Sequence, residues 1–390
     1  MRVLLLAPHA YYVVRGTPID VDLVLRGLEV RDDVTVDALV YGEGRDRSYR
    51  GITLHRTPGW KWLQGGGPGF GWKKLVNDAF MFFRAWGLLR RNRYDVIHAG
   101  EEASLMALFF KRLHGVPYVY DLDSSIAMQM VEKYPRLRFV AGVFDRVERA
   151  AIRGAIAAAP VCNALAERCR EAGAKRVFVL HDISQLENPD GPPTGRLAAE
   201  TGSDRLHMLY AGNLEPYQGI DLLLDAFGIA ARETDAIDLV VLGGTERNIV
   251  KYRKKADALG LADRVHFLGP RPFTELERYL LDADVLVAPR TRGVNTPMKV
   301  FPYLHSGRAV LVTDLPTHTQ ILTPDVCVLA APRAREFADA IVRLAEDAEL
   351  RRRIGAAGRA FAEAGHTFDA HLGRMKALYD WLEDEVRAAS

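Results

Sequence analysis

The sequence predicts an α/β protein made of two Rossmann-like, doubly wound parallel-sheet domains, and three observations support this class. The chain has 390 residues, a length that favours two domains. Its composition, 48% hydrophobic and 26% charged, is typical of globular proteins. Short Val/Ile/Leu-rich runs recur before polar loops and amphipathic stretches, the pattern of β-α units around a parallel sheet.

The apolar runs form two series. The first predicts strands over residues 3–6, 34–36, 95–98, 118–120 and 177–180. The second predicts strands over residues 208–210, 239–242, 265–268, 285–287 and 309–312. Residues 187–195 form a dense Pro/Gly stretch between the two series, and we place a hinge near residues 184–205. We therefore expect one domain over 1–186 and another over 187–369, with a C-terminal helix at about 370–390 packing back on the first.

Charge, cysteines and hydropathy exclude several classes. A net charge of +2 gives no general electrostatic reason to bind nucleic acid. Cys162, Cys169 and Cys327 match no paired or metal-ligand spacing, which favours a reducing compartment. No apolar run approaches the roughly 18 residues of a membrane-spanning helix. We expect a cytoplasmic protein.

The strongest local pattern lies between residues 288 and 307. Thr296 suits an N-cap, Pro297 the first helical position and Gly307 the position after a helix, so we expect a short helix from 297 to about 305. Pro302 then lies past the first turn, which predicts a kink or a 3₁₀ turn.

This predicted helix begins among positive charges. Arg290, Arg292 and Lys299 surround its N-terminus, whose free N–H groups favour an anion, and Asn295 and Thr296 lie beside them. The pattern predicts a phosphate site. The alternative is a surface helix with solvated basic residues.

Two further turns follow predicted strands of the second domain. Gly212 and Gly219 allow close backbone approach to a ligand, and Asn213 and Gln218 can hydrogen-bond to it without charge. The pair Gly243-Gly244 ends a later strand in the same way. Such glycines are weak signals alone, and their agreement with the basic helix strengthens them.

The first domain offers a similar turn. Arg15-Gly16-Thr17-Pro18 follows the first strand, and we expect Thr17 to cap the helix that begins there.

Polar residues follow two other strands of this domain. His98, Glu101 and Glu102 follow one strand, and Asp121 and Asp123 follow another. A spaced Asp-x-Asp can hold a divalent metal, but we favour helix caps or hydroxyl-binding carboxylates and expect no metal. For His98 the alternatives are a general base and a hydrogen-bonded structural histidine.

The segment 60–93 combines eight Trp and Phe residues with seven Lys and Arg residues. Trp72, Leu75, Val76, Phe83 and Trp86 fall on one helical face with Ala79. One interpretation is a helix that packs this face on the core. The other is an interfacial surface for an anionic membrane or a lipid-linked acceptor.

Five segments occur in an order that resembles a known family. They read LYAGNLEPYQGIDLLLDAF, LVVLGGTE, RVHFLGP, ADVLVAPR and TPMKVFPYLHSGRAVLVTD. The chain resembles the retaining family 4 glycosyltransferases of the GT-B fold, over nearly its whole length. The resemblance implies a cleft between the two domains, a nucleotide-sugar donor on the second domain, an acceptor on the first, no metal or other cofactor, and electrostatic stabilisation of the leaving diphosphate.

Four positions depart from the family pattern. The Glu-x7-Glu motif falls on Val294 and Pro302, its Arg on Asn213 and its Lys on Gln218. We expect Arg290, Arg292 and Lys299 to take over the phosphates.

The resemblance also suggests roles for the candidate residues. His98 and Asp123 lie where the family often places sugar-contacting residues, and with Arg290 and Lys299 they complete the expected catalytic set. The expected donor-binding residues are Gly16, Thr17, Gly212, Asn213, Gln218, Gly219, Gly243, Gly244, Arg292, Asn295 and Thr296. The expected acceptor-binding residues are Arg15, Glu101 and Asp121.

Three hypotheses follow from these features. The first is a glycosyltransferase acting on a glycan, lipid-linked or small-molecule acceptor in envelope or exopolysaccharide synthesis, at the inner face of the membrane if it associates peripherally. The second is a binding or scaffold protein that kept the fold and lost catalysis. The third is a sugar-nucleotide epimerase of the same fold, which turns over the donor without an acceptor.

Overall fold

A computed structural model describes residues 1–11, 16–65, 71–125 and 141–389. The chain forms two compact units, Met1–Asp182 with His371–Ser390, and Ile183–Ala370. The observed division therefore falls slightly before the expected one after residue 186. Each unit is described by itself, and the cleft expected between them stays a prediction.

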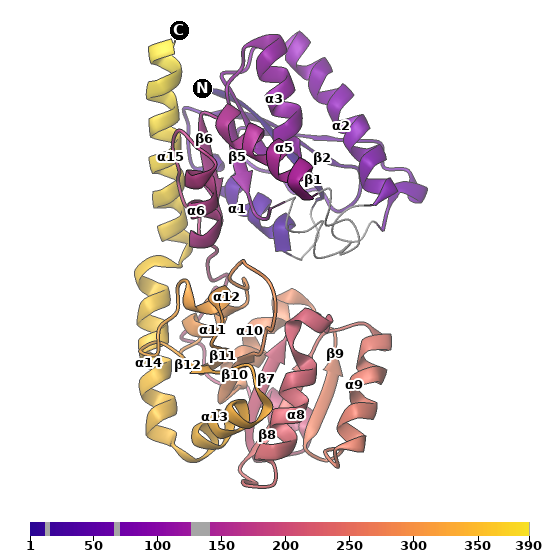
Figure 1. Cartoon of the computed structure of the whole chain (residues 1–390), viewed down its shortest axis with the longest axis vertical. Coiled ribbons are helices and arrows are strands. Elements are labelled where there is room, and N and C mark those ends of the chain that lie inside the picture. The colour runs from indigo at the N-terminus through magenta and orange to yellow at the C-terminus, as the bar shows by residue number, and fades with distance from the viewer. Residues whose placement is uncertain (12–15, 66–70, 126–140, 390) are drawn as a thin grey trace. The chain divides into compact units, whose positions relative to one another are not determined.

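The first unit contains a six-stranded parallel sheet of order β3-β2-β1-β4-β5-β6 (Figure 1). Its strands are β1 (Arg2–Ala10), β2 (Thr35–Tyr41), β3 (Ile52–Arg56), β4 (Val96–Gly100), β5 (Tyr118–Leu122) and β6 (Ala157–Pro160). In the central register Leu5 lies opposite both Ala38 and His98.

The predicted strand at 177–180 is wrong as a separate strand. Only Val177 forms an isolated bridge, to Ala158 of β6. The N–H groups of Phe178 and Leu180 still donate to Ala158 and Pro160, so this segment extends the sheet edge irregularly. The Ala-rich strand β6 was not predicted from the sequence, because alanine has a low strand propensity.

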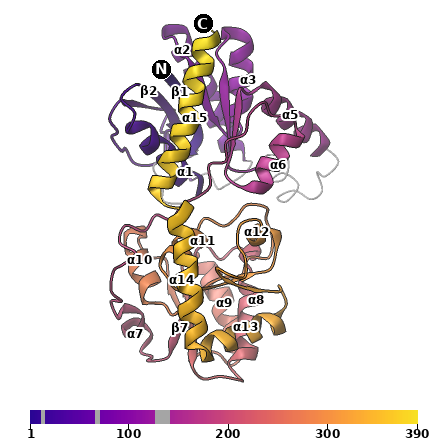
Figure 2. The same ribbon diagram turned by 90° about the vertical axis from the view of Figure 1, so that its left-hand side faces the viewer.

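Helices cover both faces of this sheet because its strands are buried on both sides. The helices are α1 (Gly16–Glu29), the 3₁₀ helix η1 (Lys61–Leu63), α2 (Trp72–Arg91), α3 (Ala103–His114), α5 (Ala141–Gly154), α6 (Asn163–Glu171) and α15 (Phe368–Ala389). One core joins α2, α3, α5 and α6 to the sheet, and the other joins α1 and α15 to its opposite face. Figure 2 shows α15 along this unit. Its residues Met375, Leu378, Tyr379 and Leu382 are buried in the second core.

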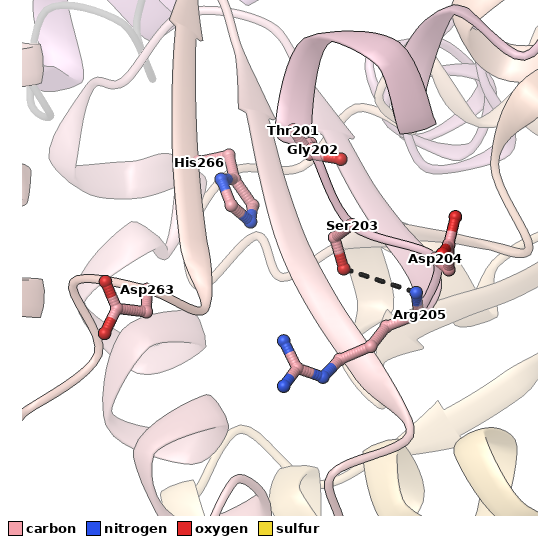
Figure 3. Close-up of a pocket in the computed structure, with 7 residues that line it drawn as sticks. All are labelled: Thr201, Gly202, Ser203, Asp204, Arg205, Asp263 and His266. Atoms are coloured by element: carbon pink, nitrogen blue, oxygen red, sulfur yellow. Dashed lines mark hydrogen bonds between the residues drawn. The ribbon is translucent and has the colours of Figure 1, made fainter.

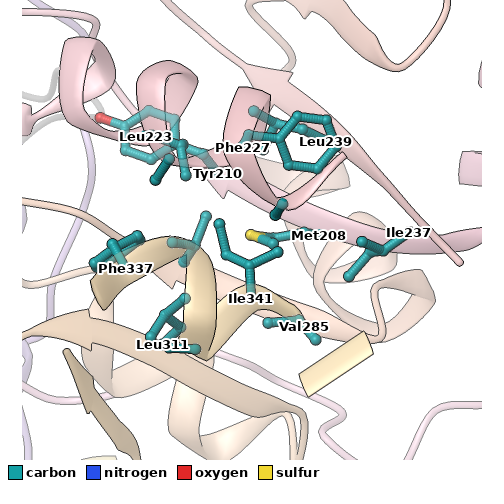
Figure 4. Packing of buried hydrophobic residues seen from close by; sticks show 14 of the residues in the cluster. Met208, Tyr210, Leu223, Phe227, Ile237, Leu239, Val285, Leu311, Phe337 and Ile341 are labelled. Atoms are coloured by element: carbon teal, nitrogen blue, oxygen red, sulfur yellow. The ribbon is translucent and has the colours of Figure 1, made fainter. Parts of the chain in front are cut away.

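The second unit contains a six-stranded parallel sheet of order β12-β11-β10-β7-β8-β9. Its strands are β7 (Leu206–Ala211), β8 (Ile237–Leu242), β9 (Val265–Gly269), β10 (Val285–Ala288), β11 (Ala309–Thr313) and β12 (Val328–Ala330). Its helices are α7 (Arg196–Thr201), the 3₁₀ helix η3 (Pro216–Gln218), α8 (Ile220–Ala230), α9 (Glu246–Ala258), α10 (Phe273–Asp282), α11 (Val300–His305), α12 (Pro316–Thr319), α13 (Ala334–Glu346) and α14 (Ala348–Gly365). Figure 4 shows one of its two cores, where Phe227 and Ile341 from α8 and α13 pack around Met208 of β7.

Strand order reverses at one point in each sheet, between β1 and β4 and between β7 and β10. The chain leaves these neighbouring strands in opposite directions, which opens a crevice at their carboxyl ends where doubly wound folds bind ligands. The loops after β7 and β10 are therefore the place to look for a ligand site in the second unit.

Candidate functional site

Lys299 lies just before α11, at this switch point of the second unit. Its Nζ donates to Gln218 Oε1 at 3.3 Å and lies 4.0 Å from the centre of the Tyr210 ring. Burial, followed by the charge of Arg290, lowers the pKa of Lys299 to about 7. Among the described residues, no carboxylate forms a salt bridge with this ammonium group within 4.0 Å. Lys299 is half-buried, and a partly desolvated cation without a neutralising carboxylate favours an anionic ligand.

Arg290 follows β10 and is held by its own loop. Its Nε donates to the Arg292 carbonyl at 2.7 Å, and one terminal nitrogen donates to the Asn295 carbonyl at 3.1 Å. The guanidinium group lies 5.3 Å from the centre of the Tyr217 ring. Arg292 and Asn295 thus contribute carbonyls that orient Arg290, while the Arg292 side chain is exposed. Ligand-binding roles for those two side chains stay predictions.

Two glycine-containing turns lie beside Lys299. A Cβ on Gly212 would collide with Lys299 Nζ, and a Cβ on Gly243 would collide with the Gly212 carbonyl oxygen. The structure therefore brings the turns after β7 and β8 together beside Lys299, as the sequence pattern suggested. Gly244 packs next to them against the Leu214 side chain.

The loop through η3 is tied to the loop after β10. Thr291 N donates to the Tyr217 carbonyl at 3.0 Å, and the Asn213 side chain donates to the Tyr217 hydroxyl at 3.4 Å. Gln218 is buried and accepts the hydrogen bond from Lys299, whereas Asn213 is exposed.

Gly219 fixes the approach of these two loops. Its φ is 78°, and a Cβ would collide with the Pro289 carbonyl oxygen. We expect Gly219→Ala to destabilise the second unit by about 3 kcal/mol, from both the left-handed backbone and the collision. Gly260→Ala is the matched control, because Gly260 has a φ of 73° and open space around its Cβ position.

Thermal unfolding checks this pair of variants. The Gly260→Ala melting temperature should fall by about 3 °C and that of Gly219→Ala by at least about 6 °C. Equal losses would show that the two loops relax without strain.

The predicted helix over 297–305 begins later than expected. The observed helix α11 covers Val300–His305, and Lys299, not Thr296, is its N-cap residue. The N–H groups of Val300 and Phe301 donate to residues three positions earlier, so a tight turn precedes the helix. Pro302 then lies in the first turn, where its missing N–H breaks no helical bond.

Two buried polar atoms near this turn have no hydrogen-bond partner among the described residues, Thr296 Oγ1 and His318 Nε2. His318 is fully buried on α12, and its Nδ1 lies 3.0 Å from both the Thr313 hydroxyl and carbonyl oxygens. Burial, together with the charges of Arg290 and Lys299, lowers the pKa of His318 to about 4. His318 is thus a neutral neighbour of the cations that no sequence motif indicated.

The first unit places His98 in its core, not at an open site. His98 is 1% exposed, its Nδ1 lies 2.9 Å from the Tyr379 hydroxyl of α15, and its Nε2 lies 3.2 Å from Asp121 Oδ2. Both ring nitrogens are engaged, so the geometry favours the structural alternative over the catalytic role expected from the sequence. The residue links the sheet to the C-terminal helix.

The turn after β1 is described only in part. Arg15 lies outside the described residues, so its expected acceptor role is not placed. Helix α1 begins at Gly16, so Thr17 lies within its first turn and is not the N-cap predicted from the sequence.

Carboxyl groups gather at the carboxyl ends of β4 and β5. Glu101 has a φ of 42°, the one positive value among described non-glycine residues, and accepts a hydrogen bond from Ser124 Oγ at 2.9 Å. Such strain is frequently found at functional sites. Burial raises the pKa of Glu101, and burial followed by the Asp121 charge raises the pKa of Asp123 well above its usual range.

Asp182 and Asp20 also belong to this carboxyl cluster, and neither was predicted from the sequence. Burial raises the pKa of Asp182 to about 6, and burial and the Asp182 charge raise that of Asp20 well above its usual range. Lys74 of α2 forms an ion pair with Glu102. Asp182 follows the apolar run 177–180, the same signal that identified Asp121, but nothing in the sequence distinguishes Asp20. Within the described part of the chain, no group of three or more His, Cys, Asp or Glu side chains is arranged to hold a metal ion.

A hollow of the second unit lies away from that unit's switch-point loops. It has a volume of about 470 Å³ and is lined by Thr201, Gly202, Ser203, Asp204, Arg205, Asp263 and His266 (Figure 3). These residues precede or begin β7 and β9, so they lie at the amino-terminal edge of the sheet, opposite the switch-point loops. The hollow therefore does not belong to the candidate site.

Comparisons with known proteins agree with this architecture. A family described as "Glycosyl transferases group 1" matches residues 198–361, and one described as "Glycosyl transferase 4-like domain" matches residues 16–181. Alpha-D-kanosaminyltransferase of Streptomyces kanamyceticus is 24% identical over 309 residues, which are 75% of this chain and 78% of that protein.

Two solved structures share the fold. Sucrose-phosphate synthase from Thermosynechococcus elongatus has a TM-score of 0.74 at 19% identity, with 100% of both chains covered. Anabaena HepE in complex with UDP-glucose has a TM-score of 0.70 at 15% identity, covering 97% of this chain and 99% of that one.

Two Rossmann-like units in one chain, each with its switch-point loops, place the protein in the GT-B class. The two matching families together cover most of the chain. The chain belongs to the family 4-like glycosyltransferases and is a glycosyltransferase.

Proposed function

We propose that this glycosyltransferase takes its sugar from a nucleotide-sugar donor whose diphosphate binds beside Lys299 and Arg290. The observation that carries the proposal is the half-buried Lys299 ammonium, which has a lowered pKa and no carboxylate partner among the described residues. A diphosphate would supply the missing negative charge. The HepE structure, which holds UDP-glucose, supports a donor of this chemical class.

The cations would act mainly on the leaving group. As the glycosidic bond to the diphosphate breaks, negative charge grows on the phosphate oxygens, and a preorganised Lys299 and Arg290 pair stabilises it. Arg290 is already oriented by two carbonyls of its loop. Asp123 and Glu101, whose pKa values are raised, would offer carboxyl groups to sugar hydroxyls on the acceptor side. We further propose retention of anomeric configuration without a metal, and a glycan, lipid-linked or small-molecule acceptor in envelope or exopolysaccharide synthesis.

A catalytically inactive binding protein is the second candidate, and one observation favours it. Val294 and Pro302 occupy the positions of the family's two glutamates, and the Val294 carbonyl only accepts a hydrogen bond from Gln320. In the family that the chain resembles, the second of these glutamates holds the donor ribose, and Pro302 offers no carboxylate there. An epimerase of the same fold is a third candidate and differs by turnover of the donor alone.

Calorimetric titration with nucleotide sugars that carry UDP, GDP, ADP and CMP tests the proposal. We expect one of them to bind at micromolar concentration, with proton uptake, because a bound diphosphate favours protonated Lys299. Near pH 7 the uptake should be about 0.5 proton, rising toward about one proton at pH 8.5, with affinity falling as the pH rises. Titrations in HEPES and in Tris measure this uptake.

The outcomes separate the candidates. Binding without proton uptake would remove Lys299 from the diphosphate site. Binding without transfer to any acceptor would favour the inactive protein, and binding with donor turnover alone would favour the epimerase. No binding to any nucleotide sugar would overturn the donor site.

A further inference from the structure

Helix α2 exposes an apolar face. The stripe that the sequence analysis considered for core packing points to solvent, with Trp72 60% exposed, Leu75 56% and Phe83 65%. The helix instead buries Asn77, Met81, Ala85 and Leu89 on its opposite side. The core-packing interpretation is therefore wrong for Trp72, Leu75 and Phe83, whereas Trp86 is partly buried against the core. Large side chains exposed along one helical face mark an interaction surface.

Two further tryptophans extend this face. Trp60 and Trp62 are about half exposed and stack on each other with ring centres 5.6 Å apart, and Trp62 stacks on Trp72 at 6.0 Å. The edge of Trp60 also meets Phe80 at 5.2 Å. This contact holds the indoles in place, so they are preorganised and lose little further freedom on binding.

Two apolar residues of the neighbouring helix α3 widen the surface. Phe109 is 44% exposed and Leu113 is 52% exposed. Phe109 packs on Phe82 of α2 at 5.4 Å between ring centres. We call the exposed side chains of Trp60, Trp62, Trp72, Leu75, Phe83, Phe109 and Leu113 the aromatic surface.

Positive charge accompanies the aromatic surface. Residues 60–93 contain seven Lys and Arg residues against a single acidic residue, although the whole chain carries a net charge of only +2. Lys61, Arg84, Arg90 and Arg91 are exposed. The one acidic residue, Asp78, lies on the other side of the helix and accepts a hydrogen bond from Tyr41 at 2.5 Å.

We propose that the aromatic surface binds the surface of an anionic lipid bilayer. Tryptophan favours the interfacial region, where its apolar ring and N–H group are both accommodated, and nearby Lys and Arg attract anionic headgroups. A symmetric contact between two copies of the chain would bring the same positive charges face to face. None of the described helices is long and apolar enough to cross a membrane, so the chain lies on the bilayer through this surface.

Flotation with lipid vesicles tests this proposal on the full chain. We expect binding to phosphatidylcholine vesicles that contain 30–40% phosphatidylglycerol, weak binding to pure phosphatidylcholine, and loss of binding as salt rises. Trp62→Ser with Trp72→Ser should reduce the partition coefficient about tenfold or more. Arg90→Gln with Arg91→Gln should reduce it by a similar factor on anionic vesicles only.

Matched controls lie in the second unit. Phe273→Ser removes a 38% exposed aromatic side chain, and Arg253→Gln with Lys254→Gln removes two exposed positive charges from α9. Both controls should bind vesicles as the parent does. All variants should retain the nucleotide-sugar affinity of the parent, so failure here is distinguishable from failure of the donor site.

Three results would overturn the proposal. One is absence of binding to anionic vesicles at low salt. Another is equal loss of binding in the second-unit controls. The third is a dimer, measured by light scattering, that dissociates on Trp62→Ser with Trp72→Ser, which would assign the surface to a second copy.

Discussion

Lys299→Met should lower glycosyl transfer at least about 100-fold and weaken nucleotide-sugar binding at pH 7. The substitution keeps an unbranched apolar chain beside Tyr210 and Gly212 but removes the charge that meets the diphosphate. Interactions with charge that develops in the transition state carry effects of this size. Steady-state kinetics with the donor identified by calorimetry measures the loss.

The same substitution should stabilise the unliganded protein. The pKa of Lys299 is lowered to about 7 from the ordinary 10.5, so the unfolded state binds more protons between these values and stability rises with pH across that window. Below pH 7 the folded parent protein holds Lys299 in its charged form, so the desolvation of this charge lowers its free energy of unfolding by the full amount. Removing it should raise the free energy of unfolding by on the order of 2 kcal/mol at pH 6.5.

Lys254→Met is the matched control, because Lys254 is exposed on α9 of the same unit. It should change neither transfer nor stability beyond about 0.5 kcal/mol. If Lys299→Met lost stability and kept full activity, Lys299 would be a structural residue and the phosphate site would lie elsewhere.

The first unit should lose stability as the pH rises from about 4 to about 7. Burial raises the pKa of Asp182 to about 6. Burial followed by the Glu102 charge raises the pKa of Asp78 to about 7, and burial, opposed by the Lys74 charge, raises that of Glu102 to about 7. Between about pH 4 and about pH 7 the folded state therefore holds protons that the unfolded state has released. The stabilising contribution of these carboxyl groups is fully present below about pH 4 and is lost as the pH rises to about 7.

Asp182→Asn should remove part of this dependence. We expect it to stabilise the first unit by about 2 kcal/mol at pH 8 and to have little effect at pH 4. Asp384→Asn, at an exposed position of α15, is the control. Hydrogen exchange of the amides in β4 and β5, compared with those in β7 and β10, follows each unit separately. First-unit protection that stays constant or increases with pH would contradict the prediction.

The sequence predicted the fold class and most central strands correctly, because buried parallel strands are continuous Val, Ile and Leu runs. The runs at 3–6 and 285–287 lie within observed strands, and the run at 95–98 overlaps β4 from Val96 onward. It did not predict β6, whose Ala-Ala-Ala-Pro sequence has no such pattern. Neighbouring strands, not propensity, make that segment extended.

The candidate site shows the same division. Arg290, Lys299 and Gly212 meet as expected, because carboxyl ends of neighbouring parallel strands lie at one edge. The predicted start of α11 at residue 297 was wrong, because a tight turn at Pro297 precedes the helix and the helix begins at Val300. His318 could not be found, because its burial beside the cations depends on how α12 packs.

The sequence by itself determined the two-unit α/β architecture, the family and the cationic loop, since all three are encoded in local patterns and their order. The tertiary structure decided which face of each helix is buried and which charges are desolvated. Periodicity shows that α2 has an apolar face, but only packing shows that this face is exposed while Met81 is buried. Likewise, any lysine is basic in sequence, and the surroundings of Lys299 alone lower its pKa to about 7.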